Sequence, residues 1–209
     1  MKSIIKGISL LTFFLLPFVM VQGQQKMKKS LIDGNFRHDY EALRSDTAVK
    51  NGYYRLYYKD KLIEKGNFYQ GKKVGLWQYY NLQGIFEFEY DYLRERVVRL
   101  SGDRDARVET PCLFKGSPLI PYIFIARNVF YPVEAREQKI SGKVILTLKI
   151  NEKGEVWAMY ISQKLHPLLD NEVLTVAKRF PAHWQWLPAT KVGVPVEGEY
   201  LITVYFDMD

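Results

Sequence analysis

The stretch from Gly66 to Lys73 comes nearest to a motif that performs chemistry. Gly66 and Gly71 are followed by Lys72 and Lys73, which approaches the spacing of a phosphate-binding loop. Such a loop needs Ser or Thr directly after its lysine to hold Mg²⁺, and it must lead from a strand into a helix. Lys73 occupies the hydroxyl position, and a strand-like run follows it. We therefore assign the two glycines to a repeat and not to a nucleotide site.

Other reactive residue types are scattered along the chain. The three histidines form no pair at the spacing of zinc ligands, and each is expected to be a surface or helix-capping residue: His38, His166 and His183. Cys112 is the only cysteine and has no histidine partner in a catalytic signature, so we interpret it as a buried or semi-buried bystander, with an intermolecular disulfide as the alternative. The sequence therefore predicts no enzyme, no cofactor and no metal site.

Length and composition favour a globular protein of one domain or two small ones. The chain has 209 residues, of which 47% are hydrophobic, an ordinary globular content. The formal net charge is +7, but the lysines alternate with acidic residues. No nucleic-acid partner is expected, because such binding needs basic residues clustered on one face or helix.

Residues 1–23 have the pattern of a secretory signal peptide. Lys2 and Lys6 precede an uncharged run from Ile8 to Val21, which is shorter than the ~20 residues that a membrane-spanning helix needs. Small residues around Gly23 suit signal peptidase. We expect cleavage after Gly23 and export of the protein, with an uncleaved anchor as the alternative.

Residues 48–100 predict an array of β-hairpins. The run from Asn51 to Tyr58 recurs from Lys73 to Tyr80, roughly 23 residues later, with a glycine followed by alternating aromatic residues in each copy. A turn and a second short run complete each copy, so each is expected to be one hairpin. Residues 24–47 are polar with weak periodicity, and we interpret them as a lead-in segment of low order.

This array resembles MORN-type repeats of the bacterial antitoxin-like variety. The positions that carry the resemblance are Gly52, Tyr54, Tyr57, Tyr58, Gly66, Gly71, Gly75, Trp77, Tyr79, Tyr80 and Gly84. One hairpin cannot bury its apolar face, so successive hairpins must share a layer of aromatic residues. Packing between hairpins and a peptide-binding face are the two interpretations of the repeat-face aromatics, which are Tyr54, Tyr57, Trp77 and Tyr79.

A linker at 101–121 leads into a C-terminal domain at 122–209. Apolar residues alternate with others from Val144 to Ile150, which predicts a strand with one face in a core. The turn from Asn151 to Gly154, with Gly154 suited to a positive φ, then reverses the chain into a second strand.

The rest of this domain predicts one helix and a closing strand. Pro167 can begin a helix, and apolar residues follow it at helical spacing from Leu169 to Phe180. The run at 197–207 is the last strand. The predicted fold class is α+β, with a C-terminal three-stranded antiparallel sheet and helices on one face, preceded by the hairpin array.

The residues of this domain resemble the C-terminal domain of TonB-type energy transducers. The resemblance runs in order through Tyr131-Pro132-x-x-Ala135-Arg136, Gly142-Lys143-Val144, the turn at 151–154, Leu169-Asp170-x-x-Val173, Phe180-Pro181, Trp186-x-Pro188-Ala189, Gly193-x-Pro195-Val196 and the closing strand to Phe206. Short blocks in this order and at these spacings make the resemblance specific.

The resemblance implies a periplasmic module that binds the N-terminal segment of an outer-membrane receptor. In that family the receptor peptide pairs with an exposed sheet edge, which here would be the last strand, by strand addition. The partner-binding candidates are Tyr131, Pro132, Arg136, Glu199, Leu201, Thr203 and Tyr205. The first three have a structural alternative, in which the Tyr-Pro pair starts a helix and Arg136 is solvated.

Two features depart from a complete energy transducer. No proline-rich spacer precedes the domain, and the hairpin array stands in its place. Cleavage of the signal would also remove the link to inner-membrane motor proteins, which are expected partners only if the N-terminus stays uncleaved. The expected location is the periplasm, or the inner membrane with a periplasmic domain in the anchored alternative.

Two hypotheses of different classes follow. In the first, the protein is an exported TonB-like component of transport across the envelope and binds an extended receptor peptide. In the second, it is a structural or protein-interaction protein of the cell envelope, with the array as binding face and the C-terminal domain as scaffold, because a fold does not certify a function.

Overall fold

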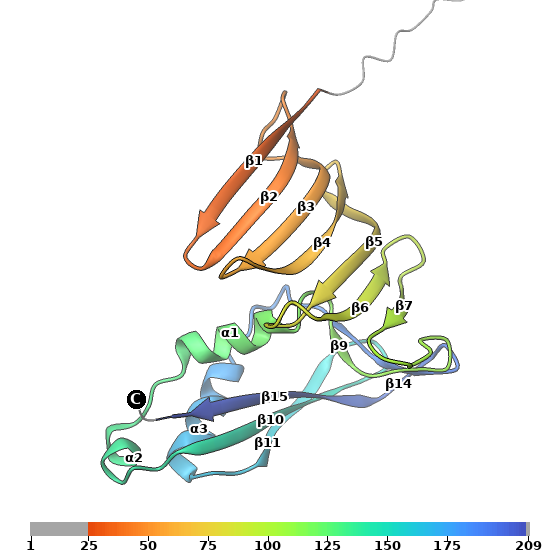
Figure 1. Ribbon diagram of the computed structural model, residues 1–209. Coiled ribbons are helices and arrows are strands. Elements are labelled where there is room, and N and C mark those ends of the chain that lie inside the picture. The colour runs from red at the N-terminus through yellow and green to blue at the C-terminus, as the bar shows by residue number, and fades with distance from the viewer. Residues whose placement is uncertain (1–24, 208–209) are drawn as a thin grey trace, which may run out of the picture.

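The computed structural model describes residues 25–207, which form an α+β fold rich in strands (Figure 1). The predicted α+β class and the predicted N-terminal hairpin array are confirmed. The predicted signal peptide, residues 1–23, lies outside the described residues. Between residues 25 and 207, no helix has the length and apolar character needed to span a membrane.

The N-terminal half is one antiparallel sheet of seven strands, in which each strand pairs with the next along the chain. The strands are β1 (Lys26–Asp33), β2 (Phe36–Leu43), β3 (Lys50–Tyr58), β4 (Lys61–Tyr69), β5 (Lys72–Tyr80), β6 (Phe86–Asp91) and β7 (Arg96–Leu100). The prediction of a low-order lead-in at 24–47 is wrong, because β1 and β2 form a fully paired hairpin. Apolar and polar residues alternate only weakly in β2, so the sequence pattern did not indicate a strand, although Tyr40 and Ala42 are buried.

Aromatic side chains fill the core of the array. Trp77 and Tyr79 are completely buried, and the Trp77 ring lies 5.6 Å from that of Tyr54 and 5.1 Å from that of Phe68. The indole also lies against the backbone of Gly66, where an added Cβ would come within 2.3 Å of it. Gly66 is therefore required by close packing of a neighbouring ring and not by phosphate binding.

The predicted linker is paired with the C-terminal part of the chain. Its strands are β8 (Glu109–Thr110), which pairs with β13 (Ala189–Lys191), and β9 (Leu113–Phe114), which pairs with β12 (Trp186–Leu187). β14 (Val194–Val196) continues the small sheet beyond β13. Cys112 lies between β8 and β9 and is buried, as predicted.

The C-terminal sheet has the strand order β11-β10-β15. Its elements are α2 (Val133–Glu137), β10 (Gly142–Ile150), β11 (Val156–Gln163), α3 (Pro167–Ala177) and β15 (Gly198–Phe206). Gly154 turns β10 into β11 with φ 79°, as predicted. His166 caps α3, because its Nδ1 accepts a hydrogen bond from the Leu168 amide at 3.4 Å.

Helix α1 (Leu119–Asn128) joins the two halves, and Figure 1 shows it between the array and β15. Leu119 and Ile123 belong to the aromatic core of the array. Ile125 belongs to the other core, which also contains Val144, Leu146 and the buried residues of α3. One helix therefore contributes side chains to both hydrophobic cores.

Ile123→Ala tests this shared packing. We expect it to lower the free energy of unfolding by about 2–5 kcal/mol, because a buried aliphatic side chain is lost and a cavity remains. The urea-induced transition should stay single when it is followed by both tryptophan fluorescence and circular dichroism. Ala126→Ser, on the exposed side of the same helix, should change the free energy by less than about 0.5 kcal/mol. Separate transitions for the two halves would contradict the shared core.

Candidate functional site

Strand β15 forms a free edge of the C-terminal sheet. It pairs with β10 without interruption, from Gly142 opposite Phe206 to Ile150 opposite Gly198. In the described part of the chain, no other strand pairs with it. Its outer row of backbone amide and carbonyl groups therefore has no strand partner among the described residues, which is the condition for strand addition.

The other edges of the seven-stranded sheet and of the β11-β10-β15 sheet have several positive charges or irregular pairing, whereas β15 carries one charged side chain, Glu199. β1 carries Lys26, Lys28 and Lys29, and β7 carries Arg96 and Arg99. Charged side chains of this kind discourage pairing with further strands. β11 carries no charge, but its pairing with β10 has two register shifts, and such irregularities also disfavour strand addition.

The side chains of β15 divide as the sequence predicts. Ile202, Val204 and Phe206 are each 4% exposed and lie in the core. The opposite face carries the four candidates Glu199, Leu201, Thr203 and Tyr205, of which Leu201 is 55% and Tyr205 62% exposed. The structure therefore brings these four together on one open face of a regular edge strand.

Glu199 is fixed by a neighbour across the sheet. The Tyr160 hydroxyl on β11 donates a hydrogen bond of 2.8 Å to Glu199 Oε1. This bond raises the pKa of Tyr160, because it and the nearby negative charge stabilise the protonated phenol. The outward face of the sheet thus has an acidic group near the start of β15 and exposed apolar groups further along it.

The array reaches the far end of the same strand. A hollow of about 350 Å³ is lined by Tyr205 on β15, by Leu82 and Glu87 of the array, and by Leu119 and Tyr122 of α1. The turn between β5 and β6 that holds Leu82 is well defined. Its Asn81 Oδ1 accepts hydrogen bonds from the amides of Gln83 and Ile85, each at 3.0 Å. Local sequence patterns could not predict this hollow, because it joins three segments that are distant in the chain.

The Tyr-Pro motif has a structural role in this fold. Tyr131 donates a hydrogen bond from its hydroxyl to the Ile140 carbonyl, and its ring packs edge-on against Phe206 at 5.5 Å. Pro132 directly precedes α2, and Arg136 is exposed with its guanidinium 5.8 Å from the Tyr131 ring. The motif therefore anchors α2 beside the end of β15, and of its three candidate residues Arg136 is the most exposed.

The repeat-face aromatics are mostly core residues. Tyr54 is 6% exposed, and Trp77 and Tyr79 are fully buried. Burial raises the pKa of Tyr54 and of Tyr79 well above the ordinary value. Tyr57 alone is partly exposed, with the Arg37 guanidinium 4.2 Å from its ring centroid. Packing is therefore the interpretation that fits three of these four residues.

The histidines and acidic residues do not gather into a metal site. Within residues 25–207, no group of three or more His, Cys, Asp or Glu side chains is placed to hold a metal ion. His38 is partly buried in the array and lies 2.8 Å from the Tyr54 hydroxyl, so it is neither a surface nor a capping residue. Burial, and then the charge of Lys50, lower the pKa of His38.

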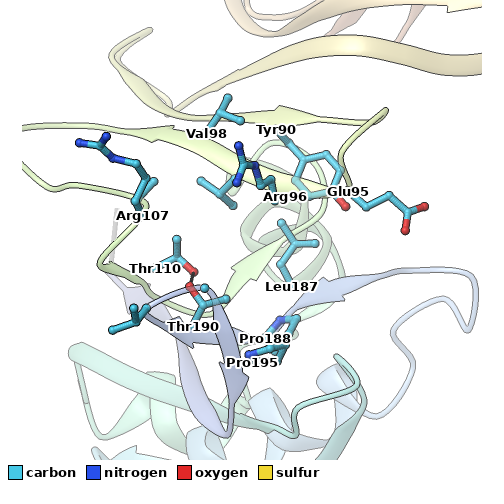
Figure 2. A pocket seen from close by; sticks show the side chains of 14 residues that line it. Tyr90, Glu95, Arg96, Val98, Arg107, Thr110, Leu187, Pro188, Thr190 and Pro195 are labelled. Carbon is cyan, nitrogen blue, oxygen red and sulfur yellow. Dashed lines mark hydrogen bonds between the residues drawn. The ribbon is translucent and has the colours of Figure 1, made fainter.

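A further cleft lies where the array meets the small β-sheet of the C-terminal part. It encloses about 580 Å³, with Tyr90 on the array side and Leu187, Pro188 and Pro195 opposite (Figure 2). The hydroxyls of Thr110 and Thr190 hydrogen-bond to each other at 2.9 Å. Glu95, Arg96 and Arg107 also line this cleft, and most of its other side chains are apolar, which fits a joint between the two halves.

Comparison with known protein families gave a match to the C-terminal part of the chain. The family model described as Gram-negative bacterial TonB protein C-terminal matches residues 127–208. That match contains β10, β11, α3 and β15 and does not extend to the array, so the MORN-type resemblance stays a prediction. Searches of curated proteins and of solved structures gave no match.

Tyr131→Phe tests the structural role of the Tyr-Pro motif. We expect it to lower the free energy of unfolding by about 1 kcal/mol, because the Ile140 carbonyl loses its hydroxyl donor while the ring contact with Phe206 stays. The matched control is Tyr205→Phe, which removes an exposed hydroxyl and should change the free energy by less than about 0.5 kcal/mol. Urea denaturation followed by circular dichroism measures both. Equal stability of the two variants would contradict the anchoring role.

Proposed function

We propose that this protein is a TonB-like component of TonB-dependent transport that acts in the periplasm and is not an enzyme. Its C-terminal domain binds the extended N-terminal segment of an outer-membrane receptor as an additional strand on β15. The observation that carries the proposal is the regular edge of β15, which has no second strand partner and lies within the segment that matches the TonB C-terminal family.

Strand addition explains how such an edge binds without a deep pocket. Backbone hydrogen bonds hold an extended peptide of almost any sequence, and side-chain contacts select among peptides. Leu201 and Tyr205 offer exposed apolar surface on one face of the strand. The hollow beside Tyr205 would take one side chain of the peptide, so the array contributes to selection at this point.

Export and connection to a motor are further parts of the proposal. An exported chain without residues 1–23 would act as a soluble adaptor in the periplasm. A chain that keeps these residues as an anchor would remain in the inner membrane, where motor proteins become its partners. Both forms use the same β15 edge, so the binding experiments below apply to either.

The edge is tested by Thr203→Pro. Proline removes one backbone donor from β15, so we expect capture of receptor N-terminal peptides to weaken by at least about tenfold. Thr203→Ala is the control, because it shortens the same side chain and keeps the amide. Synthetic peptides from the outer-membrane receptors of the native host are titrated in a fluorescence anisotropy assay, and circular dichroism verifies the fold of each variant.

A second readout covers the case in which proline at this position unfolds the sheet. Leu201→Cys presents a thiol on the outward face, and peptides with a single cysteine should form a disulfide with it at one peptide position more efficiently than at the others. Unchanged capture by Thr203→Pro, or disulfide formation independent of the cysteine position, would overturn binding at this edge.

The contribution of the array is tested by Leu82→Asp. A charge in the hollow beside Tyr205 should weaken peptide binding roughly tenfold, because it must be desolvated when a side chain enters. Leu93→Asp is the matched control, since Leu93 lies on the turn between β6 and β7 and is 81% exposed. Equal affinity for the two variants would leave β15 as the binding edge but remove the array from selection.

A further inference from the structure

A second hollow, separate from the one beside Tyr205, lies between the array and the segments around Lys115 and Trp184. It encloses about 680 Å³ and shares no lining residue with the hollow beside Tyr205. Its apolar walls are formed by Tyr92 of the array and by Phe114, Ile120 and Trp184. A volume of this size suits a metabolite-sized ligand, since small-molecule sites commonly measure about 300–1,000 Å³.

Lys115 is positioned at this hollow by backbone bonds. Its amide donates a hydrogen bond of 2.9 Å to the Gln185 carbonyl, and it directly follows β9. From there its side chain reaches the array, where Nζ lies 5.1 Å from the Tyr90 ring centroid and 5.4 Å from that of Tyr92. Within residues 25–207, no carboxylate lies within 4.0 Å of this ammonium group.

The other charged groups of the hollow leave an excess of positive charge. Glu64 is 4% exposed and forms an ion pair with Lys73, whose Nζ also lies 4.0 Å from the Trp77 ring centroid. That pair is neutral as a unit. Lys72 also lines the hollow and is exposed, so Lys72 and Lys115 have no carboxylate of the lining left to balance them.

The surroundings of Lys115 penalise its charge. Burial is the main cause that lowers its pKa, and the charge of Lys73 lowers it further, while Glu95 raises it from beyond ion-pair distance. Lys50, near the same Glu64, has its pKa lowered by burial and by Lys73. Burial thus disfavours the charged form of Lys115, and no carboxylate lies within ion-pair distance of it, so an added anion would stabilise this ammonium group.

We infer that this hollow binds a small organic anion, a carboxylate or phosphate monoester with a ring-sized body, and that Lys115 is the principal cation that holds it. The anionic group pairs with the Lys115 ammonium, beside the Glu64–Lys73 pair. The ring contacts Tyr92 and Trp184. The site does not involve β15, so its existence is independent of the proposed peptide binding.

The experiment titrates the full chain with benzoate and phenyl phosphate, and follows the indole and amide signals in ¹H–¹⁵N NMR spectra. Saturable shifts at Trp184 and Lys115 are expected with at least one of these probes. The two probes distinguish a carboxylate from a phosphate ligand. Benzamide, a neutral isostere of benzoate, should not bind, and inorganic phosphate should bind more weakly than phenyl phosphate, because it lacks the ring.

Lys115→Gln should weaken binding of the anionic probe by roughly tenfold or more, because a hydrogen-bonded ion pair is lost. Lys28→Gln is the control, since Lys28 is an exposed lysine on β1 and carries the same charge change. Lys115→Met keeps an unbranched stem against Tyr90 and Tyr92, so it should stay folded and still lose the anion. Thermal denaturation verifies that both Lys115 variants are folded.

Three outcomes would overturn the inference. The first is the absence of saturable shifts at millimolar concentrations of both anionic probes. The second is equal binding by the Lys115 and Lys28 variants, which would indicate general screening of surface charge. The third is equal binding of benzamide and benzoate, which would mean that the hollow takes apolar rings without using its charge.

Discussion

Burial of α1 between two sheets is the constraint on which the rest of the structure depends. Leu119 and Ile123 pack into the aromatic core of the array, and Ile125 packs into the core of the C-terminal sheet. A helix that is apolar on most of its surface is stable only when it is covered on more than one side. The two halves are therefore coupled through hydrophobic burial, and the position of the array relative to β15 is fixed by it.

That coupling decides what surrounds the free edge. In Figure 1, β15 is the strand of its sheet that lies nearest to α1 and the array. The turn holding Leu82 can line a hollow with Tyr205 only because α1 brings the two together. The same arrangement places Lys115, which belongs to the segment before α1, against Tyr90 and Tyr92 of the array. Both hollows are thus consequences of one helix packing on two sheets.

Local patterns predict the parts of this fold whose signals are local. The alternation of apolar residues from Val144 to Ile150 predicted strand β10, because side-chain direction alternates between neighbouring residues of a strand. Gly154 predicted the turn that follows β10, because a turn at this point needs a residue that tolerates a positive φ. The same alternation in β15 separated the buried Ile202 from the exposed Leu201. This face of the candidate site could therefore be predicted before any tertiary contact was known.

Features that depend on distant partners were missed. Helix α1 was assigned in part to a linker, because Pro118 and Pro121 interrupt its apolar pattern, although proline is tolerated in the first turn of a helix. Likewise, nothing local distinguishes a buried Trp77 from one that binds a peptide. Its burial depends on Gly66, Phe68 and Tyr54 from neighbouring strands.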